Sequence, residues 1–207
     1  MPPPALPLPV RLSAFYFAFF AWWAAYVAYL PLYLSGRGLG AGEIALVLAL
    51  PQAARIVTPT AWGWLADRFG AQRGIVALSC VMMILGFVAL PFVHGAGGIA
   101  LVIGAMGIFS TAALPLVEAI TMTSLGGRAG LYGPIRLWGS IGFILVVLAG
   151  GAWLDVGSVG VLPGSLVAIA LVALAAALFL PAGAEAFKRD IPHAVVRLEA
   201  DPAAREN

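Results

Sequence analysis

The chain has 207 residues, of which 62% are hydrophobic and only 10% are charged, and its formal net charge is +2 at pH 7. Soluble domains carry about a quarter of charged residues, so this composition and a mean hydropathy of +1.03 exclude a water-soluble globular protein. The chain is therefore predicted to lie in a lipid bilayer.

A helix needs about 20 apolar residues to cross the hydrocarbon core. Between charged and Gly/Pro-rich breaks, the sequence predicts six such helices, and thus an all-α, polytopic membrane protein. The predicted spans are 12–34, 43–64, 74–93, 99–124, 135–154 and 163–181. Together they form a bundle at 12–181, with a cytoplasmic segment at 1–11 before it and a polar cytoplasmic tail at 182–207 after it. The first apolar run is too long for the core of a signal peptide, so we expect it to be retained.

The first predicted span carries an aromatic stripe. Spacings of four and three place its members on one helix face: Phe15, Phe19, Trp22, Tyr26, Tyr29 and Tyr33. Such a face can line a cavity and stack on a sugar or an aromatic ring, with tyrosine hydroxyls as donors. Trp22, Tyr26 and Tyr29 are the candidate solute-binding members, since the two tyrosines lie deep in the span. Helix packing or lipid contact is the alternative.

Three charged residues are predicted to lie inside the membrane: Arg55, Glu118 and Arg136. A charge in hydrocarbon is costly and is usually turned toward a partner or a watery cavity. Arg55 lies near the middle of the second span. Glu118 and Arg136 lie at similar depths on consecutive antiparallel helices, where they can pair. Mutual neutralisation of Glu118 and Arg136, and a packing or snorkelling role for Arg55, are the alternatives to solute binding.

The stretch from Gly63 to Arg73 is predicted to be a short charged connection between the second and third spans. It resembles the cytoplasmic loop of the major facilitator superfamily, whose pattern is Gly, three residues, Asp, a basic residue, any residue, Gly, any residue and two basic residues. Gln72 departs from that pattern, and five positions fit: Gly63, Asp67, Arg68, Gly70 and Arg73. We expect Gly63 to let two helices approach closely, Asp67 to cap or pair with a helix end, and the arginines to anchor the loop. The resemblance implies a gating role for this motif.

A second block, from Tyr132 to Phe143, resembles the start of the fifth helix in the branch that includes lactose permease and the phenylpropionate and nucleoside proton symporters. Pro134 stands where that branch often has another basic residue. The resemblance covers the first six of the family's usual twelve helices, which form a 3+3 inverted repeat. It implies that Glu118 and Arg136 contact the solute. Because Pro134 replaces that second basic residue, any role that it has in the branch is in doubt for this chain.

Basic residues set the orientation, because short cytoplasmic loops are enriched in Lys and Arg. One set of connections contains Arg37 alone. The other set contains Arg11, Arg68, Arg73, Arg128, Lys188 and Arg189. Both termini are therefore predicted to be cytoplasmic, in an inner (plasma) membrane. An even number of spans requires the same side for both.

The sequence thus predicts the amino-terminal half of a secondary transporter for a sugar, a nucleoside or an aromatic acid, with proton-coupled symport. Glu118 is the one carboxylate in the spans that could carry the proton. No cofactor, metal or nucleic-acid partner is expected, and an enzyme is disfavoured because both histidines, His94 and His193, lie outside the spans. The expected partners are the bilayer, the solute and a second six-helix bundle, either a missing half or another copy. A six-helix module with a structural or assembly role is the alternative function.

Overall fold

The computed structural model describes residues 6–154 and 157–181. Within them, six helices are long and apolar enough to cross a membrane, which confirms the predicted all-α architecture. The helices are α1 (Leu8–Gly36), α2 (Ala41–Phe69), α3 (Gln72–Ala89), α4 (Gly95–Leu125), α5 (Tyr132–Leu154) and α6 (Leu162–Leu178). Short 3₁₀ turns, η1 (Leu90–Phe92), η2 (Ala129–Leu131) and η3 (Val159–Val161), precede α4, α5 and α6. The predicted tail at 182–207, and residues 1–5 of the predicted amino-terminal segment, lie outside the described residues.

The helices pack as an inverted repeat. α1 lies against α5 and α6, α4 lies against α2 and α3, and α3 lies against α6. Exchanging the first three helices for the last three reproduces this set of contacts. Burial repeats in the same way: α1 and α4 each bury thirteen residues, α2 and α5 three, and α3 and α6 six. The predicted 3+3 repeat is therefore confirmed.

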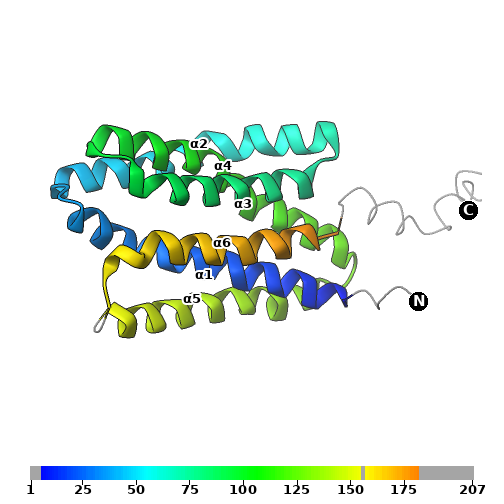
Figure 1. The fold of residues 1–207 in the computed structure, drawn as a ribbon. Coiled ribbons are helices and arrows are strands. Elements are labelled where there is room, and N and C mark those ends of the chain that lie inside the picture. The colour runs from blue at the N-terminus through cyan, green and yellow to red at the C-terminus, as the bar shows by residue number, and fades with distance from the viewer. Residues whose placement is uncertain (1–5, 155–156, 182–207) are drawn as a thin grey trace, which may run out of the picture.

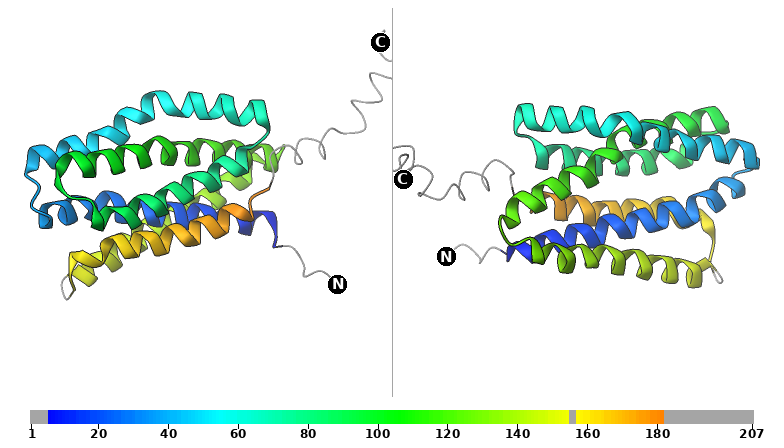
Figure 2. Two further views of the ribbon diagram at one scale, coloured as in Figure 1. Left: turned by 45° about the horizontal axis from the view of Figure 1, so that its top comes forward. Right: turned by 180° about the vertical axis from the view of Figure 1, so that it is seen from behind.

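Two pairs of helices face each other across the bundle. In Figure 1, α2 and α4 lie on one side and α1 and α5 on the other, with α3 and α6 joining the two sides; Figure 2 shows the same division from behind. The start of α1 and the end of α6 lie at one end of the bundle, where Arg11 donates a hydrogen bond from Nε to the carbonyl of Phe179. Because of this division, α1 and α5 face α2 and α4 across the middle of the bundle.

Glycines set the close approaches within each helix pair. A Cβ on Gly107 of α4 would lie 2.8 Å from the Cβ of Pro51 on α2. On the other side, a Cβ on Gly142 of α5 would meet the backbone carbonyl oxygen of Phe17 on α1. Small residues allow helix backbones to approach in this way inside a bilayer. Gly107 and Gly142 therefore act in helix packing.

The predicted charged connection is mostly helix. α2 continues to Phe69 and α3 begins at Gln72, so Asp67 and Arg68 lie in the last turn of α2. No helix breaker stands between Pro59 and Gly70 apart from Gly63, and the helix ends where Gly70 adopts φ +60°. At 1.5 Å per residue, the 29 residues of α2 extend for about 43 Å, beyond a hydrocarbon core of about 30 Å. The prediction of a loop at 63–69 is therefore wrong.

Candidate functional site

A cavity of about 470 Å³ lies between α1, α2, α4 and α5. It brings together all three of the charged residues predicted within the membrane, Arg55 from α2, Glu118 from α4 and Arg136 from α5. We call it the charged cavity. Its remaining walls are aromatic, hydroxyl and apolar side chains from three helices: Phe19, Phe20, Trp23, Pro59, Ser110, Thr111, Leu114 and Pro115.

Arg55 of α2 contacts an aromatic side chain of α1, the helix that faces it. Its guanidinium carbon lies 4.7 Å from the centroid of the Trp23 ring, within the range of a cation–π contact. Its Nη1 also donates to Oε1 of Gln52, one turn earlier on α2, over a long 3.4 Å. Arg55 is exposed in this six-helix bundle, so it marks the open side of the charged cavity.

Arg136 is held in a similar way on α1. Its guanidinium carbon lies 3.9 Å from the centroid of the Phe20 ring and 5.5 Å from that of Tyr16. The hydroxyl of Tyr16 in turn shares a hydrogen bond of 3.2 Å with Thr121 of α4. A Cβ on Gly139, one turn further along α5, would lie 2.9 Å from Cδ2 of Phe20. The absence of a side chain at Gly139 thus leaves room for the ring that supports the arginine.

Glu118 and Arg136 share the charged cavity without pairing. Glu118 is half-buried. Among the described residues, we find no nitrogen–oxygen contact within 4.0 Å that joins Glu118 to an arginine. The alternative in which the two side chains neutralise each other and tie α4 to α5 is therefore not what this structure shows. Both charges remain turned toward the same open space.

The hydroxyl groups beside the cavity bond within the protein. Thr111 of α4 and Thr58 of α2 share a hydrogen bond of 2.6 Å, and Thr111 also lies 3.0 Å from the carbonyl oxygen of Ile108. Ser110 donates to the carbonyl of Gly107 over 3.3 Å. The Thr58–Thr111 bond joins α2 to α4, and the other two bonds lie within α4.

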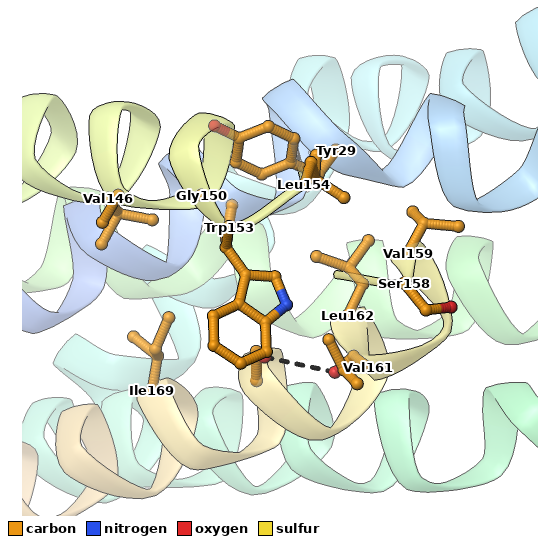
Figure 3. Close-up of a pocket in the computed structure, with 13 residues that line it drawn as sticks. Tyr29, Val146, Gly150, Trp153, Leu154, Ser158, Val159, Val161, Leu162 and Ile169 are labelled. Carbon is orange, nitrogen blue, oxygen red and sulfur yellow. Dashed lines mark hydrogen bonds between the residues drawn. The ribbon is translucent and has the colours of Figure 1, made fainter. Parts of the chain in front are cut away.

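The other three predicted solute-binding residues lie elsewhere. Trp22 and Tyr26 are 1% and 6% exposed and stack on each other, with centroids 5.2 Å apart, while their edges meet Phe87 of α3. Tyr29 donates its hydroxyl proton to the carbonyl of Val147 on α5. It lines a separate apolar cavity of about 360 Å³ between α1, α5 and α6, where Trp153 also lies (Figure 3). A solute contact by these three side chains stays a prediction.

Phe19 of the predicted stripe does line the cavity. Sequence reasoning missed the aromatic residues that lie against the two arginines. Tyr16, Phe20 and Trp23 also recur at spacings of four and three, one position out of phase with the stripe that contains Trp22 and Tyr26. This second stripe carries the two arginines. The periodic signal was therefore present, but nothing in the sequence shows which of two adjacent aromatic faces is turned to the core.

The motif at 63–73 is anchored at its second half. Arg73 donates from Nη1 to the carbonyl of Leu180 over 3.4 Å, beside the contact that Arg11 makes with Phe179, and Asp67 accepts a long 3.5 Å bond from Gln72. Within these six helices, a Cβ at Gly63 would meet open space. The close helix approach expected at Gly63 therefore stays a prediction. Gly63 lies on α2, whose outer surface is largely uncovered. The gating role of the motif stays a prediction.

A family model described as the MFS_1 like family matches residues 9–205. This chain belongs to that family of the major facilitator superfamily. Its relatives include the maltose permease of Geobacillus stearothermophilus, 29% identical over 143 residues that make up 68% of this chain and 36% of the permease. The uncharacterized transporter YwbF of Bacillus subtilis is 27% identical and covers 68% of this chain and 35% of its own length.

The fold also matches a solved member of the superfamily. The crystal structure of the nucleoside transporter NupG aligns with a TM-score of 0.76 and 20% identity, over 90% of this chain and 47% of NupG. At this identity the likeness shows the fold. The chain spans about a third of the length of the curated relatives and about half of NupG. It is a multi-pass membrane protein of a transporter family.

Proposed function

We propose that this chain is the solute-binding half of a secondary transporter that carries a small organic solute together with a proton. The observation that supports this most is the convergence of Arg55, Glu118 and Arg136, from three helices, on one open cavity. Charges within a bilayer are expensive and are usually functional. Here the three charges stand around an unfilled space, and two of them are braced by aromatic rings.

Transport by alternating access needs a second bundle that moves against the first. The surfaces that such a bundle would cover are the outer faces of α2 and α5, each of which buries only three residues. Ile56, Val57 and Trp64 of α2 are 81%, 69% and 62% exposed. The partner is either a further half of the same kind or another copy of this chain, and the open position of Gly63 agrees with a close contact to it.

The proposed location is the plasma membrane, with both termini of the chain in the cytoplasm. Arg11 and Arg73 both contact the carbonyls at the end of α6, so they lie at one end of the bundle. Arg37 lies at the opposite end of α1. Because cytoplasmic connections are enriched in basic residues, the end that contains Arg11 and Arg73 is assigned to the cytoplasm.

Glu118 is the proposed proton carrier, since it lines the charged cavity together with Arg55 and Arg136. A carboxylate whose proton affinity changes with the state of such neighbours can couple proton and solute. Replacement by an isosteric amide removes the titrating group. The pH dependence of solute binding should therefore disappear in Glu118→Gln, and an unchanged pH dependence would exclude Glu118 from this role.

Solute binding to the full chain in lipid nanodiscs tests the proposal. A panel of maltose, uridine and the aromatic acid trans-cinnamate represents the three solute classes. At least one of them should bind to the wild type, and Arg136→Ala should abolish that binding without loss of folding or insertion. Arg128→Ala is the matched control, because Arg128 is exposed in the α4–α5 connection. Intact binding by Arg136→Ala would refute the site, and no binding of any class would favour a module with an assembly role.

A further inference from the structure

We infer that the charged cavity selects a small organic anion, a single carboxylate on a flat aromatic body, over neutral sugars and nucleosides. This inference rests on the proposed function and narrows its solute class. Three features of the cavity carry it: the two arginine side chains, the excess of hydrogen-bond donors over acceptors in the wall, and the sum of the charges.

The guanidinium carbons of both arginines lie over aromatic rings, that of Arg55 over Trp23 and that of Arg136 over Phe20. The N–H donors of a guanidinium lie in its plane and form a rigid fork. The single hydrogen bond found for Arg55 is the long one to Gln52, and within the described residues none is found for Arg136. Two planar forks of donors therefore border the cavity, and such forks match the two oxygens of a carboxylate.

Apart from the arginines, the polar side chains of the wall are two hydroxyl groups, whose protons are used within the protein, and one carboxylate. The proton of Ser110 is directed to the carbonyl of Gly107, and the hydroxyl of Thr111 bonds Thr58 and lies near the carbonyl of Ile108. A sugar or ribose ring carries several hydroxyl protons, each of which needs an acceptor when it leaves water. Glu118 is the one carboxylate among the lining residues. A carboxylate ligand brings acceptors alone and therefore suits a wall rich in donors.

The charges of the lining residues sum to two positive and one negative. An uncompensated positive charge at membrane depth is costly, and a monoanion would neutralise it. The ring of Phe19, set edge-on to that of Phe20 with centroids 5.8 Å apart, and the indole of Trp23 form an aromatic wall on α1. A flat aromatic body can stack there while its carboxylate reaches the arginines.

The test compares trans-cinnamate with cinnamamide, which has the same shape without the charge at pH 7. Uridine and maltose represent neutral nucleosides and sugars. Equilibrium binding to the full chain in nanodiscs is measured by isothermal titration calorimetry. Cinnamate should bind at least about tenfold more tightly than cinnamamide, which corresponds to one charge-assisted hydrogen bond.

Substitutions test whether the preference for the anion comes from the two arginines of the cavity. Arg55→Gln and Arg136→Gln should each weaken cinnamate binding by about tenfold or more and should weaken cinnamamide binding by a smaller factor, because the amide carries no charge. Arg136→Lys keeps the charge but loses the fork and should fall between the wild type and Arg136→Gln. Arg128→Gln removes an exposed charge outside the cavity and should bind as the wild type does. Thermal melting of each variant confirms that it is folded.

Equal affinities for cinnamate and cinnamamide, or tight binding of uridine or maltose with weak binding of cinnamate, would overturn the anion class and leave the proposed transport function standing. Loss of cinnamate binding in Arg128→Gln would also overturn it, since the effect would then come from general surface charge. Failure of all four compounds to bind the wild type would overturn both proposals.

Discussion

Helix α1 has two aromatic faces that differ in what they touch. Trp22 and Tyr26 stack on each other and against Phe87 in a closed core with α3. Phe20 and Trp23, one position further along, support two arginines at an open cavity. The residue types are the same on both faces. The partner helix, and not the residue type, decides whether a ring packs or binds, and the following substitutions test this comparison in order of decreasing effect.

The closed face should tolerate truncation least. Trp22→Ala removes a side chain that is 1% exposed and leaves a cavity in the core, so we expect a loss of about 3 kcal/mol or more in the free energy of unfolding. Trp23→Ala removes a ring that is half-buried and supports Arg55, so it should cost less stability and weaken solute binding instead. Thermal melting and solute binding in nanodiscs separate the two. If Trp22→Ala and Trp23→Ala lowered the free energy of unfolding equally, the two aromatic faces of α1 would not differ as described.

Two arginines extend the comparison. Arg37 donates to the hydroxyl of Tyr33 at 2.9 Å and to the carbonyls of Leu90 and Val93, at 3.3 and 2.7 Å, where α3 ends. Arg37→Gln should therefore destabilise the fold by about 1.5–3 kcal/mol and leave solute affinity unchanged. Arg55→Gln should do the reverse, since Arg55 binds no helix end. The comparison fails if Arg37→Gln changes solute affinity as much as Arg55→Gln does.

Gly139 links packing to the cavity. A Cβ there would lie 2.9 Å from Phe20 and 3.0 Å from Nη1 of Arg136, so Gly139→Ala must displace the ring or the guanidinium. We expect a loss of about 1–2 kcal/mol in stability together with weaker solute binding. Gly133→Ala is the control on the same helix, because a Cβ at Gly133 has no neighbour within 4 Å. Wild-type affinity in Gly139→Ala would show that the position of Phe20 does not matter for binding.

The sequence was sufficient for the parts of the fold that follow from hydropathy. Six spans and the presence of Arg55, Glu118 and Arg136 within the bundle could be predicted, because an apolar chain interrupted by a few charges leaves few arrangements in a bilayer. The end of α2 could not be predicted, since its polar last turn has the composition of a loop although the helix continues to Phe69. The sequence also does not show which face of α1 is turned to the core. Two aromatic stripes lie side by side on this helix, and only the contacts with α3 and α5 distinguish them.

Protection of an engineered thiol tests most directly whether the charged cavity is the solute site. Cys80 is the sole cysteine of the sequence and is fully buried in α3, so a cysteine placed at Leu114, in the cavity wall, is the one reactive thiol. A charged maleimide should alkylate Leu114→Cys in nanodiscs, and a bound solute should slow the reaction, whereas Arg128→Cys, exposed in the α4–α5 connection, should react and gain no protection. A thiol at Leu114 that no solute of the panel protects, although one of them binds the protein, would contradict the assignment.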